Sequence, residues 1–127
     1  MAFSYRDLKV WQRSIGLCTG IYRLTRDFPA EETYGLSAQL RRASVSVASN
    51  IAEGYGRGNR GDFRRFLAIA RGSILELQTQ LLIANELGYG KKMNLQEVQG
   101  TAEEVGKMLW ALMQKHSAGR TASASDF

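Results

Sequence analysis

Four stretches of the chain repeat apolar residues at alternating intervals of three and four positions. This spacing places the apolar residues on one face of an α-helix. It predicts helices over residues 7–28, 36–53, 62–87 and 94–115. The first helix should stop before Pro29, because the residue that precedes a proline avoids the helical conformation. Four helices with short links favour an all-α fold, an antiparallel up-down-up-down four-helix bundle.

Two of these helices carry apolar residues on more than one side. The first has two apolar stripes: Leu8, Trp11, Ile15, Cys18 and Tyr22, and Val10, Leu17, Ile21 and Leu24. The third has a core stripe of Phe63, Phe66, Ala70, Ile74, Leu77, Leu81 and Ala84, with Ile69, Leu75, Leu82 and Ile83 on other faces. We expect a wide buried face on the first helix and more than one neighbour for the third.

The inward positions of the other two helices are predicted in the same way. They are Leu36, Leu40, Ala43, Val47 and Ile51 in the second helix, and Leu95, Val98, Ala102, Val105, Leu109 and Leu112 in the fourth.

Glycine and asparagine mark the expected helix ends. Gly54 is a natural residue to follow the second helix, and Gly88 ends the third. Asn94 with Glu97 three residues later resembles a capping box for the fourth helix. Residues 1–116 therefore form the predicted bundle, and residues 117–127, rich in Ser and Ala, form a predicted disordered tail.

Length and composition fit a single soluble domain. A chain of 127 residues can bury one core. The lone Cys18 cannot form an intrachain disulfide, the N-terminal residues do not resemble a secretion signal, and no uncharged apolar run reaches the ~18 residues needed to span a bilayer. We expect a cytoplasmic protein with no membrane partner.

The excess positive charge is concentrated in one segment. The chain has a formal net charge of +5, and the segment from Arg41 to Arg71 alone holds seven arginines against Glu53 and Asp62. A local excess of this kind is the electrostatic footprint of a protein that binds a polyanion. Arginine suits that role because its planar fork donates paired hydrogen bonds to phosphate oxygens. The candidate nucleic-acid-binding residues are Arg41, Arg42, Arg57, Arg60, Arg64, Arg65 and Arg71.

The helix positions suggest how these arginines are grouped. Arg41 and Arg42 precede the end of the second helix by about 12 residues, and Arg71 lies a comparable distance into the third, so these three can sit at similar heights. The other four should line the loop between the two helices. A simpler interpretation remains open, in which the arginines pair with carboxylates of this chain or of a neighbouring subunit and form a solvated face.

The loop itself offers two further candidates. Gly54, Gly56, Gly58 and Gly61 could cradle an anion, but no strand precedes them and no Gly-Lys-Ser/Thr follows, so helix termination is the favoured interpretation. Tyr55 could stack on an unpaired base, although packing against the end of the bundle is favoured.

No arrangement of residues indicates catalysis or a cofactor. The only histidine, His116, lies at the edge of the predicted tail, away from Ser44, Ser46 and Ser49, and these serines with Asn50 are interpreted as helix-packing residues. A di-iron bundle needs Glu-x-x-His repeats, which are absent from the sequence. We therefore expect no enzymatic activity, no metal and no cofactor, and we interpret Cys18 as a small core residue.

Several sequence motifs resemble one known family. They are SYRDLKVWQ at residues 4–12, YGLSAQLRRASVSVASNIAEGYGR at 34–57, DFRRFLAIARGSILEL at 62–77 and ELGY at 86–89. They resemble the four-helix-bundle family of the 23S rRNA intervening-sequence protein. That family is similar to the accessory protein of diversity-generating retroelements, a basic homopentamer that binds nucleic acid beside a reverse transcriptase. The resemblance implies a pentamer of bundles and supplies no catalytic residue.

The sequence hypothesis is a non-enzymatic basic bundle that assembles into a ring. It would bind nucleic acid, structured RNA rather than DNA, through phosphate contacts with little sequence specificity. Two alternatives stay open: a scaffold that docks an acidic protein partner such as a reverse-transcriptase-like enzyme, and a purely structural bundle.

Overall fold

The computed structural model describes residues 3–117, and its regular structure within that range is entirely helical. The elements are the 3-10 helices η1 (Tyr5–Asp7) and η2 (Ala30–Glu32) and the α-helices α1 (Lys9–Thr25), α2 (Leu36–Gly56), α3 (Arg60–Leu87) and α4 (Lys92–Lys115). The four predicted helices and the all-α class are therefore confirmed. The predicted tail, apart from Ser117, lies outside the described residues.

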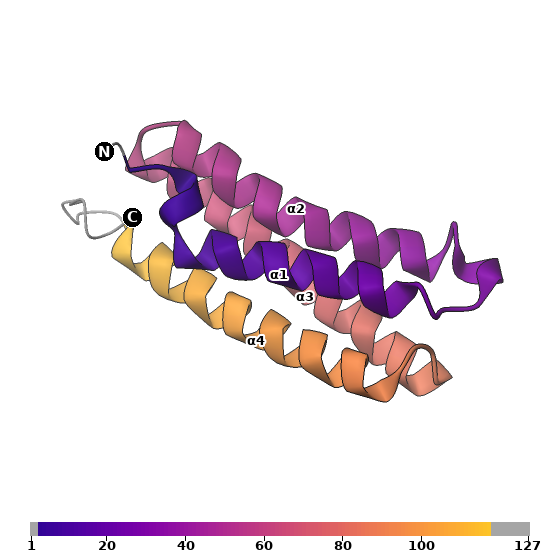
Figure 1. The fold of residues 1–127 in the computed structure, drawn as a ribbon. Helices are drawn as coiled ribbons and strands as arrows, with labels where there is room; N and C mark the ends of the chain where they lie inside the picture. Colours follow the sequence, from indigo (N-terminus) through magenta and orange to yellow (C-terminus); the bar gives the residue numbers. More distant parts are fainter. Residues whose placement is uncertain (1–2, 118–127) are drawn as a thin grey trace.

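The four long helices lie side by side along one axis (Figure 1). α2 and α3 each pack against the next helix in the chain, and α1 contacts both α2 and α4. α1 begins, α2 connects to α3 and α4 ends at one end of the molecule, which we call the turn end (Figure 1). The segment around η2 and the α3–α4 connection lie at the other end, which we call the far end.

Two predicted helix starts are wrong for local reasons. Ser4 caps the separate helix η1, where its side chain and that of Asp7 form a capping box, so α1 begins only at Lys9. Gly88 and Gly90 have φ of +74° and +77°, a conformation that glycine adopts without steric cost. Because these glycines reverse the chain within a few residues, α4 begins at Lys92. Asn94 therefore lies inside the helix instead of capping it. The predicted ends at Gly88 and Lys115 are confirmed.

Gly54 does not end α2, contrary to the sequence prediction. It is buried within the helix, and a Cβ atom placed there would collide with the Cβ of Phe66. Glycine at this position lets the backbone of α2 approach α3 closely. The residue with positive φ is Gly58, at +77°, one residue beyond the Arg57 that follows α2.

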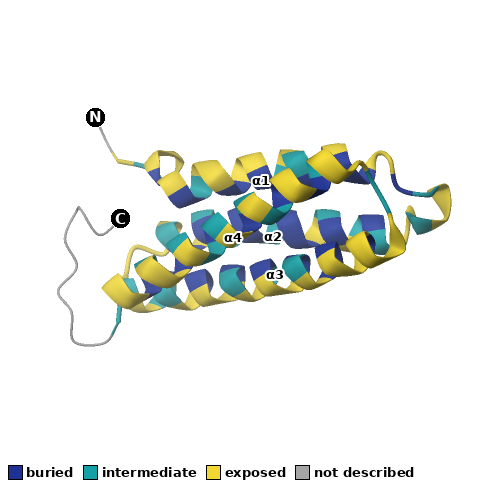
Figure 2. Ribbon diagram, turned by 90° about the horizontal axis from the view of Figure 1, so that it is seen from below, coloured by how far each residue is buried: buried dark blue, intermediate teal, exposed yellow. Residues whose placement is uncertain are grey.

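The core lies along the bundle axis between the four helices (Figure 2). All the core positions predicted for α3 are buried, as are most of those for α2 and α4; Leu36 and Leu112 are half-buried. The predicted stripe of Val10, Leu17, Ile21 and Leu24 is buried. In the other predicted stripe Leu8 is buried, Trp11 and Cys18 are half-buried, and Ile15 and Tyr22 are exposed. The predicted wide buried face is therefore formed only in part, because α1 packs against α2 and α4 and no other long helix.

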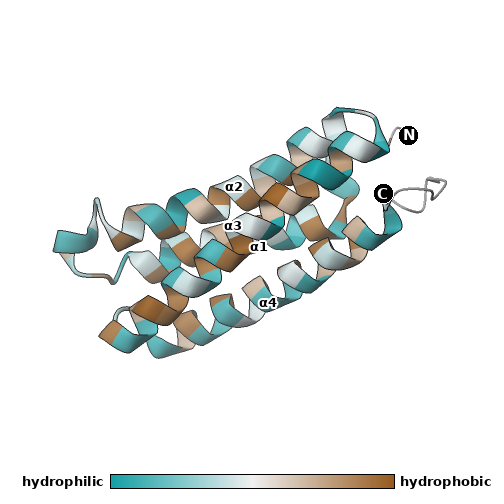
Figure 3. Cartoon of the chain, turned by 180° about the vertical axis from the view of Figure 1, so that it is seen from behind, coloured by the Kyte–Doolittle hydropathy of each residue, from teal (hydrophilic) through white to brown (hydrophobic). Residues whose placement is uncertain are grey.

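α3 keeps a second apolar surface outside the core (Figure 3). Ile69, Leu75, Leu82 and Ile83 are between 43% and 56% exposed. By length and composition alone α3 could cross a membrane, and 39% of its most apolar window is buried in the fold. Core helices of soluble proteins meet the same criterion, so this property supports no membrane assignment.

Candidate nucleic-acid interface

The α2–α3 connection brings four of the predicted arginines to the turn end. α2 ends at Gly56, and Asn59 caps α3 by accepting a hydrogen bond from the backbone N–H of Asp62 at 2.8 Å. An asparagine in the extended conformation before a helix is a favoured N-cap. The short link places Arg57, Arg60, Arg64 and Arg65 around one turn; we call these four residues the turn cluster.

Arg57 and Arg65 are held over the same aromatic ring. Their guanidinium carbons lie 5.1 Å and 4.9 Å from the ring centroid of Phe66, which is buried. A guanidinium over a ring face is attracted by the negative charge density of the ring. These contacts place one guanidinium from the end of α2 and one from the first turns of α3 against the same ring.

The carboxylate partners of this pair are themselves exposed to solvent. Arg57 lies 3.1 Å from Glu53 and Arg65 lies 3.6 Å from Asp62, and the two arginine side chains are 48% and 61% exposed. Exposed ion pairs contribute little free energy because water screens them. The side-chain hydrogen bond from Asn59, with smaller contributions from Arg65 and Arg57, lowers the pKa of Asp62 below its ordinary value although partial burial opposes the shift. Both arginines can therefore exchange their carboxylates for a competing anion.

Arg60 and Arg64 have a structural role at the same end. Arg60 donates to the carbonyl of Ser117 at 2.8 Å, and Arg64 Nε donates to the carbonyl of Met113 at 3.2 Å. The last carbonyls of a helix lack partners within that helix. Arg60 supplies a partner for the Ser117 carbonyl, and Arg64 adds a second donor to the Met113 carbonyl, which already accepts from the backbone N–H of His116. Both contacts fasten the end of α4 to the start of α3. Arg60 Nε is buried and makes no hydrogen bond with a described residue.

The remaining three predicted arginines do not join the turn cluster. Ser46 of α2 contacts Ser73 of α3 at 2.9 Å, which makes Ala48 level with Arg71 in these two oppositely directed helices. Arg41 precedes Ala48 by seven residues in α2, a displacement of roughly 10 Å along the helix axis toward the far end. The expected common height is therefore not observed.

These arginines also point to different neighbours. Arg41 lies over the ring of Tyr22 on α1 at 4.8 Å and donates to Thr25 Oγ1 at 2.8 Å. Arg71 lies over the ring of the exposed Trp110 on α4 at 5.0 Å. Arg42 is exposed, and its side chain makes no hydrogen bond, ion pair or ring contact with a described residue.

The other sequence candidates have packing roles in the fold. Tyr55 belongs to the last turn of α2 and makes an edge contact with the ring of Phe63. Asn50 donates to the carbonyl and hydroxyl oxygens of Ser46 at the α2–α3 contact. His116, next to the predicted tail, is buried, with its ring edge-on to Phe63 at 5.0 Å.

Cys18 is only half-buried and lies 3.4 Å from the Ser44 hydroxyl, so its predicted place in the core is wrong.

Two further arginines were missed by the sequence analysis. Arg23 and Arg26 lie in the last turn and at the end of α1 and are exposed. Their charges are balanced along the chain by acidic residues, so a window in the sequence does not reveal them. Arg26 and Arg41 nevertheless line one cavity at the far end. Only the packing of α1 against α2 shows this proximity.

Within residues 3–117 no group of three or more His, Cys, Asp or Glu side chains could hold a metal ion.

Comparisons with known proteins identify the fold and the family. The sequence model described as 23S rRNA-intervening sequence protein matches residues 6–111. A crystal structure of a protein with unknown function from the S23 ribosomal protein family of Bacteroides thetaiotaomicron VPI-5482 superposes with a TM-score of 0.75 at 23% sequence identity. The alignment covers 83% of this chain and 95% of that one, and at this identity it shows the fold alone. No curated protein sequence matches the chain.

Proposed function

This chain belongs to the 23S rRNA-intervening sequence protein family, and from that premise we propose that it is a non-enzymatic, RNA-binding helical bundle. The observation that carries the proposal is the exposed pair Arg57 and Arg65, fixed over Phe66 with exposed carboxylates as partners. The family description refers to an intervening sequence of 23S rRNA, which favours RNA over DNA as the polyanion.

The pair is suited to phosphate because both guanidinium groups are oriented before binding. Each planar fork can donate two parallel hydrogen bonds to a phosphate. Arg57 and Arg65 are the primary contacts in this proposal, and Arg42 and Arg71 are additional ones. Arg60 and Arg64 add positive charge while they hold α4. Such contacts position the protein on RNA without reading bases.

The proposal includes a finer architecture than the fold class. We propose an antiparallel up-down-up-down bundle that associates into a cyclic homo-oligomer in the cytoplasm. The exposed apolar residues of α3 support the association, because Leu75 and Leu82 leave water only if a second surface covers them. Leu75→Glu with Leu82→Glu should convert the assembly to monomers in analytical ultracentrifugation. A wild-type protein that sediments as a monomer would contradict this part of the proposal.

The test of RNA binding compares two double variants with the same loss of charge. Arg57→Gln with Arg65→Gln removes the proposed contacts. Arg13→Gln with Arg23→Gln removes two exposed arginines of α1. Fluorescence anisotropy across a salt series measures the slope of log affinity against log salt, which is about −0.7 per contact on single-stranded and −0.9 on duplex nucleic acid. The first variant should flatten the slope by about 1.4 to 1.8 and the second should leave it nearly unchanged.

Equal slopes for the two variants, or a wild-type response that is flat with salt, would overturn the RNA proposal. Binding to an acidic protein that is lost in the first variant and not competed by RNA would instead favour a protein-docking scaffold. Circular dichroism and sedimentation of each variant control for changes in fold and assembly.

A further inference from the structure

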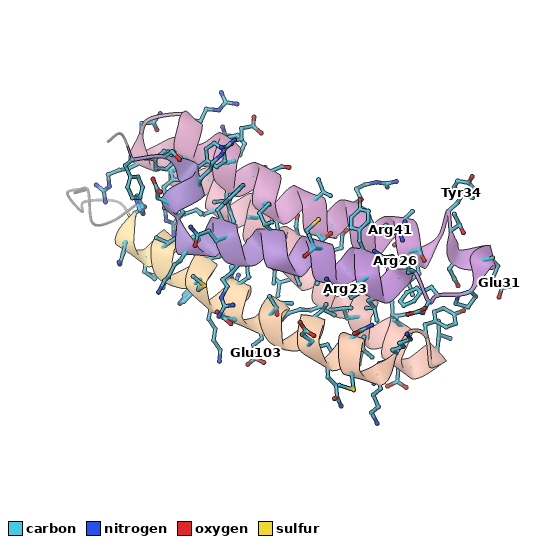
Figure 4. The ribbon with its side chains drawn as sticks, viewed as in Figure 1. Arg23, Arg26, Glu31, Tyr34, Arg41 and Glu103 are labelled. Carbon is cyan, nitrogen blue, oxygen red and sulfur yellow. The ribbon has the colours of Figure 1, made fainter. Side chains whose placement is uncertain are left out.

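A polar cavity lies at the far end of the bundle, where α1 ends, η2 follows and α2 begins. It has a volume of ≈ 330 Å³, and its polar lining comes from Arg26, Arg41, Thr25, Thr33 and Ser37. Figure 4 shows Arg26 and Arg41 on adjacent helices at this end, away from the turn cluster. We propose that this cavity is a second anion site that binds a phosphate group.

The positive charge of the cavity comes from two arginines that no carboxylate neutralises. Arg26 is exposed, and its side chain makes no hydrogen bond, ion pair or ring contact with a described residue. Arg41 uses Nε to donate to Thr25 Oγ1 and rests on the ring of Tyr22, which fixes the side chain. A guanidinium has five N–H donors, so most of those on Arg41 remain for a ligand.

Ser37 provides the second, independent observation. Ser37 is only 5% exposed and lines the cavity, and its hydroxyl makes no hydrogen bond with a described residue. Most buried polar side chains in proteins have a partner. Ser37 is also the second residue of α2, where backbone N–H groups have no acceptor within the helix and the helix dipole favours an anion. A phosphate oxygen would satisfy the hydroxyl.

Three carboxylates are sequence neighbours of cavity-lining residues; those of Glu32 and Asp27 are engaged elsewhere, whereas Glu31 is exposed and its side chain makes no hydrogen bond or ion pair with a described residue. Glu32 accepts hydrogen bonds from the backbone N–H of Leu36 and from the Tyr89 hydroxyl, each at 3.0 Å. Asp27 lies 3.9 Å from Lys91 of the α3–α4 connection. Because neither Arg26 nor Arg41 forms an ion pair with a described carboxylate, both can attract an external anion.

The ligand chemistry is a phosphate group, which has two sources. It can be a phosphodiester of the RNA that the turn end binds, or a free phosphate or phosphomonoester. The inference does not depend on RNA binding, because inorganic phosphate alone tests the cavity. If the Arg57 and Arg65 variants left RNA binding unchanged, the cavity proposal would still hold. If the cavity variants left phosphate binding unchanged, the proposal of RNA binding at the turn end would still hold.

The experiment uses the full chain with Arg26→Gln, Ser37→Ala and the matched control Arg23→Gln. Arg23 is also exposed in the last turn of α1 but does not line the cavity. Isothermal titration with inorganic phosphate and anisotropy with an RNA oligonucleotide are measured for each protein. Urea unfolding checks that stability is unchanged.

If the cavity takes a free phosphate, Arg26→Gln and Ser37→Ala should weaken phosphate binding at least fivefold while Arg23→Gln leaves it unchanged. If it takes the RNA backbone, Arg26→Gln should flatten the salt slope by about 0.7 to 0.9 relative to Arg23→Gln. Either result supports the site. The inference is overturned if Arg26→Gln and Arg23→Gln behave alike in both titrations.

Discussion

The two ends of the bundle use arginine in opposite ways. At the turn end, every arginine of the turn cluster already has a protein partner: a carbonyl of the α4 end, a carboxylate or the ring of Phe66. At the far end, Arg26 has none among the described residues, and Arg41 is held only by a hydroxyl and a ring. The turn cluster holds more arginines close together in the sequence, and its arginines are also the ones that already have protein partners in the fold.

The difference teaches that charge density and charge availability are separate properties. A guanidinium that donates to a backbone carbonyl contributes to stability, and removing it takes that hydrogen bond away. A guanidinium with an exposed partner or no partner can be transferred to an incoming anion at little cost. We therefore expect substitutions at the turn end to affect mainly stability, except at Arg57 and Arg65.

The largest expected effect tests whether stability depends on the close approach of α2 to α3 at the turn end. Gly54→Ala places a Cβ against Phe66, whose own Cβ cannot rotate away, so the free energy of unfolding should fall by about 3 kcal/mol. Gly56→Ala is the control, because no atom lies within 4 Å of its added Cβ. That variant should be neutral or more stable by up to about 1 kcal/mol. Urea unfolding followed by circular dichroism measures both, and similar values would show that the close approach is not needed.

The second effect tests the structural role of the inner arginines. Arg60→Met with Arg64→Met removes two hydrogen bonds to the α4 end and should lower the free energy of unfolding by about 2 kcal/mol. Arg23→Met with Arg26→Met removes the same charge at the far end, where these side chains make no hydrogen bond or ion pair with a described residue, and should change it by less than about 0.5 kcal/mol. Equal losses in urea unfolding would remove the distinction between the two ends.

A smaller effect concerns the carboxylate that competes with RNA. Asp62→Asn frees Arg65 from its ion pair and should raise RNA affinity at pH 7 by up to about fivefold, the range of an exposed ion pair. The lowered pKa of Asp62 means that its stabilising contribution is complete above the unfolded-state pKa and is lost as pH falls through the folded-state value. The affinities of wild type and variant should therefore converge under acidic conditions. An affinity that falls in the variant at pH 7 would contradict competition.

The smallest effect isolates an arginine with no partner. Arg42→Gln should leave unfolding unchanged and flatten the salt slope of RNA binding by about 0.7 to 0.9, the value for one phosphate contact. The same variant in the background of Arg57→Gln and Arg65→Gln tests additivity. An unchanged slope would restrict the RNA surface to the turn end.

Much of the fold follows from the sequence alone. The period of apolar residues located four helices, and Gly88 correctly marked the end of α3. Capping was predicted less well, because Gly54 and Asn94 have the right residue types in positions where packing or a fast turn takes precedence. Local chemistry indicates where a helix can end, but it does not indicate whether a neighbouring helix requires a glycine for close contact.

The sequence by itself determined the helical class, the core stripes of α2, α3 and α4, and a local excess of arginine. Only the tertiary structure decided which arginines are available. Arg57 and Arg65 share a ring, Arg60 and Arg64 hold α4, and Arg26 joins Arg41 from another helix. The physical reason is that a side chain's partners depend on helix register and packing. Both are set by long-range contacts that a window along the chain does not contain.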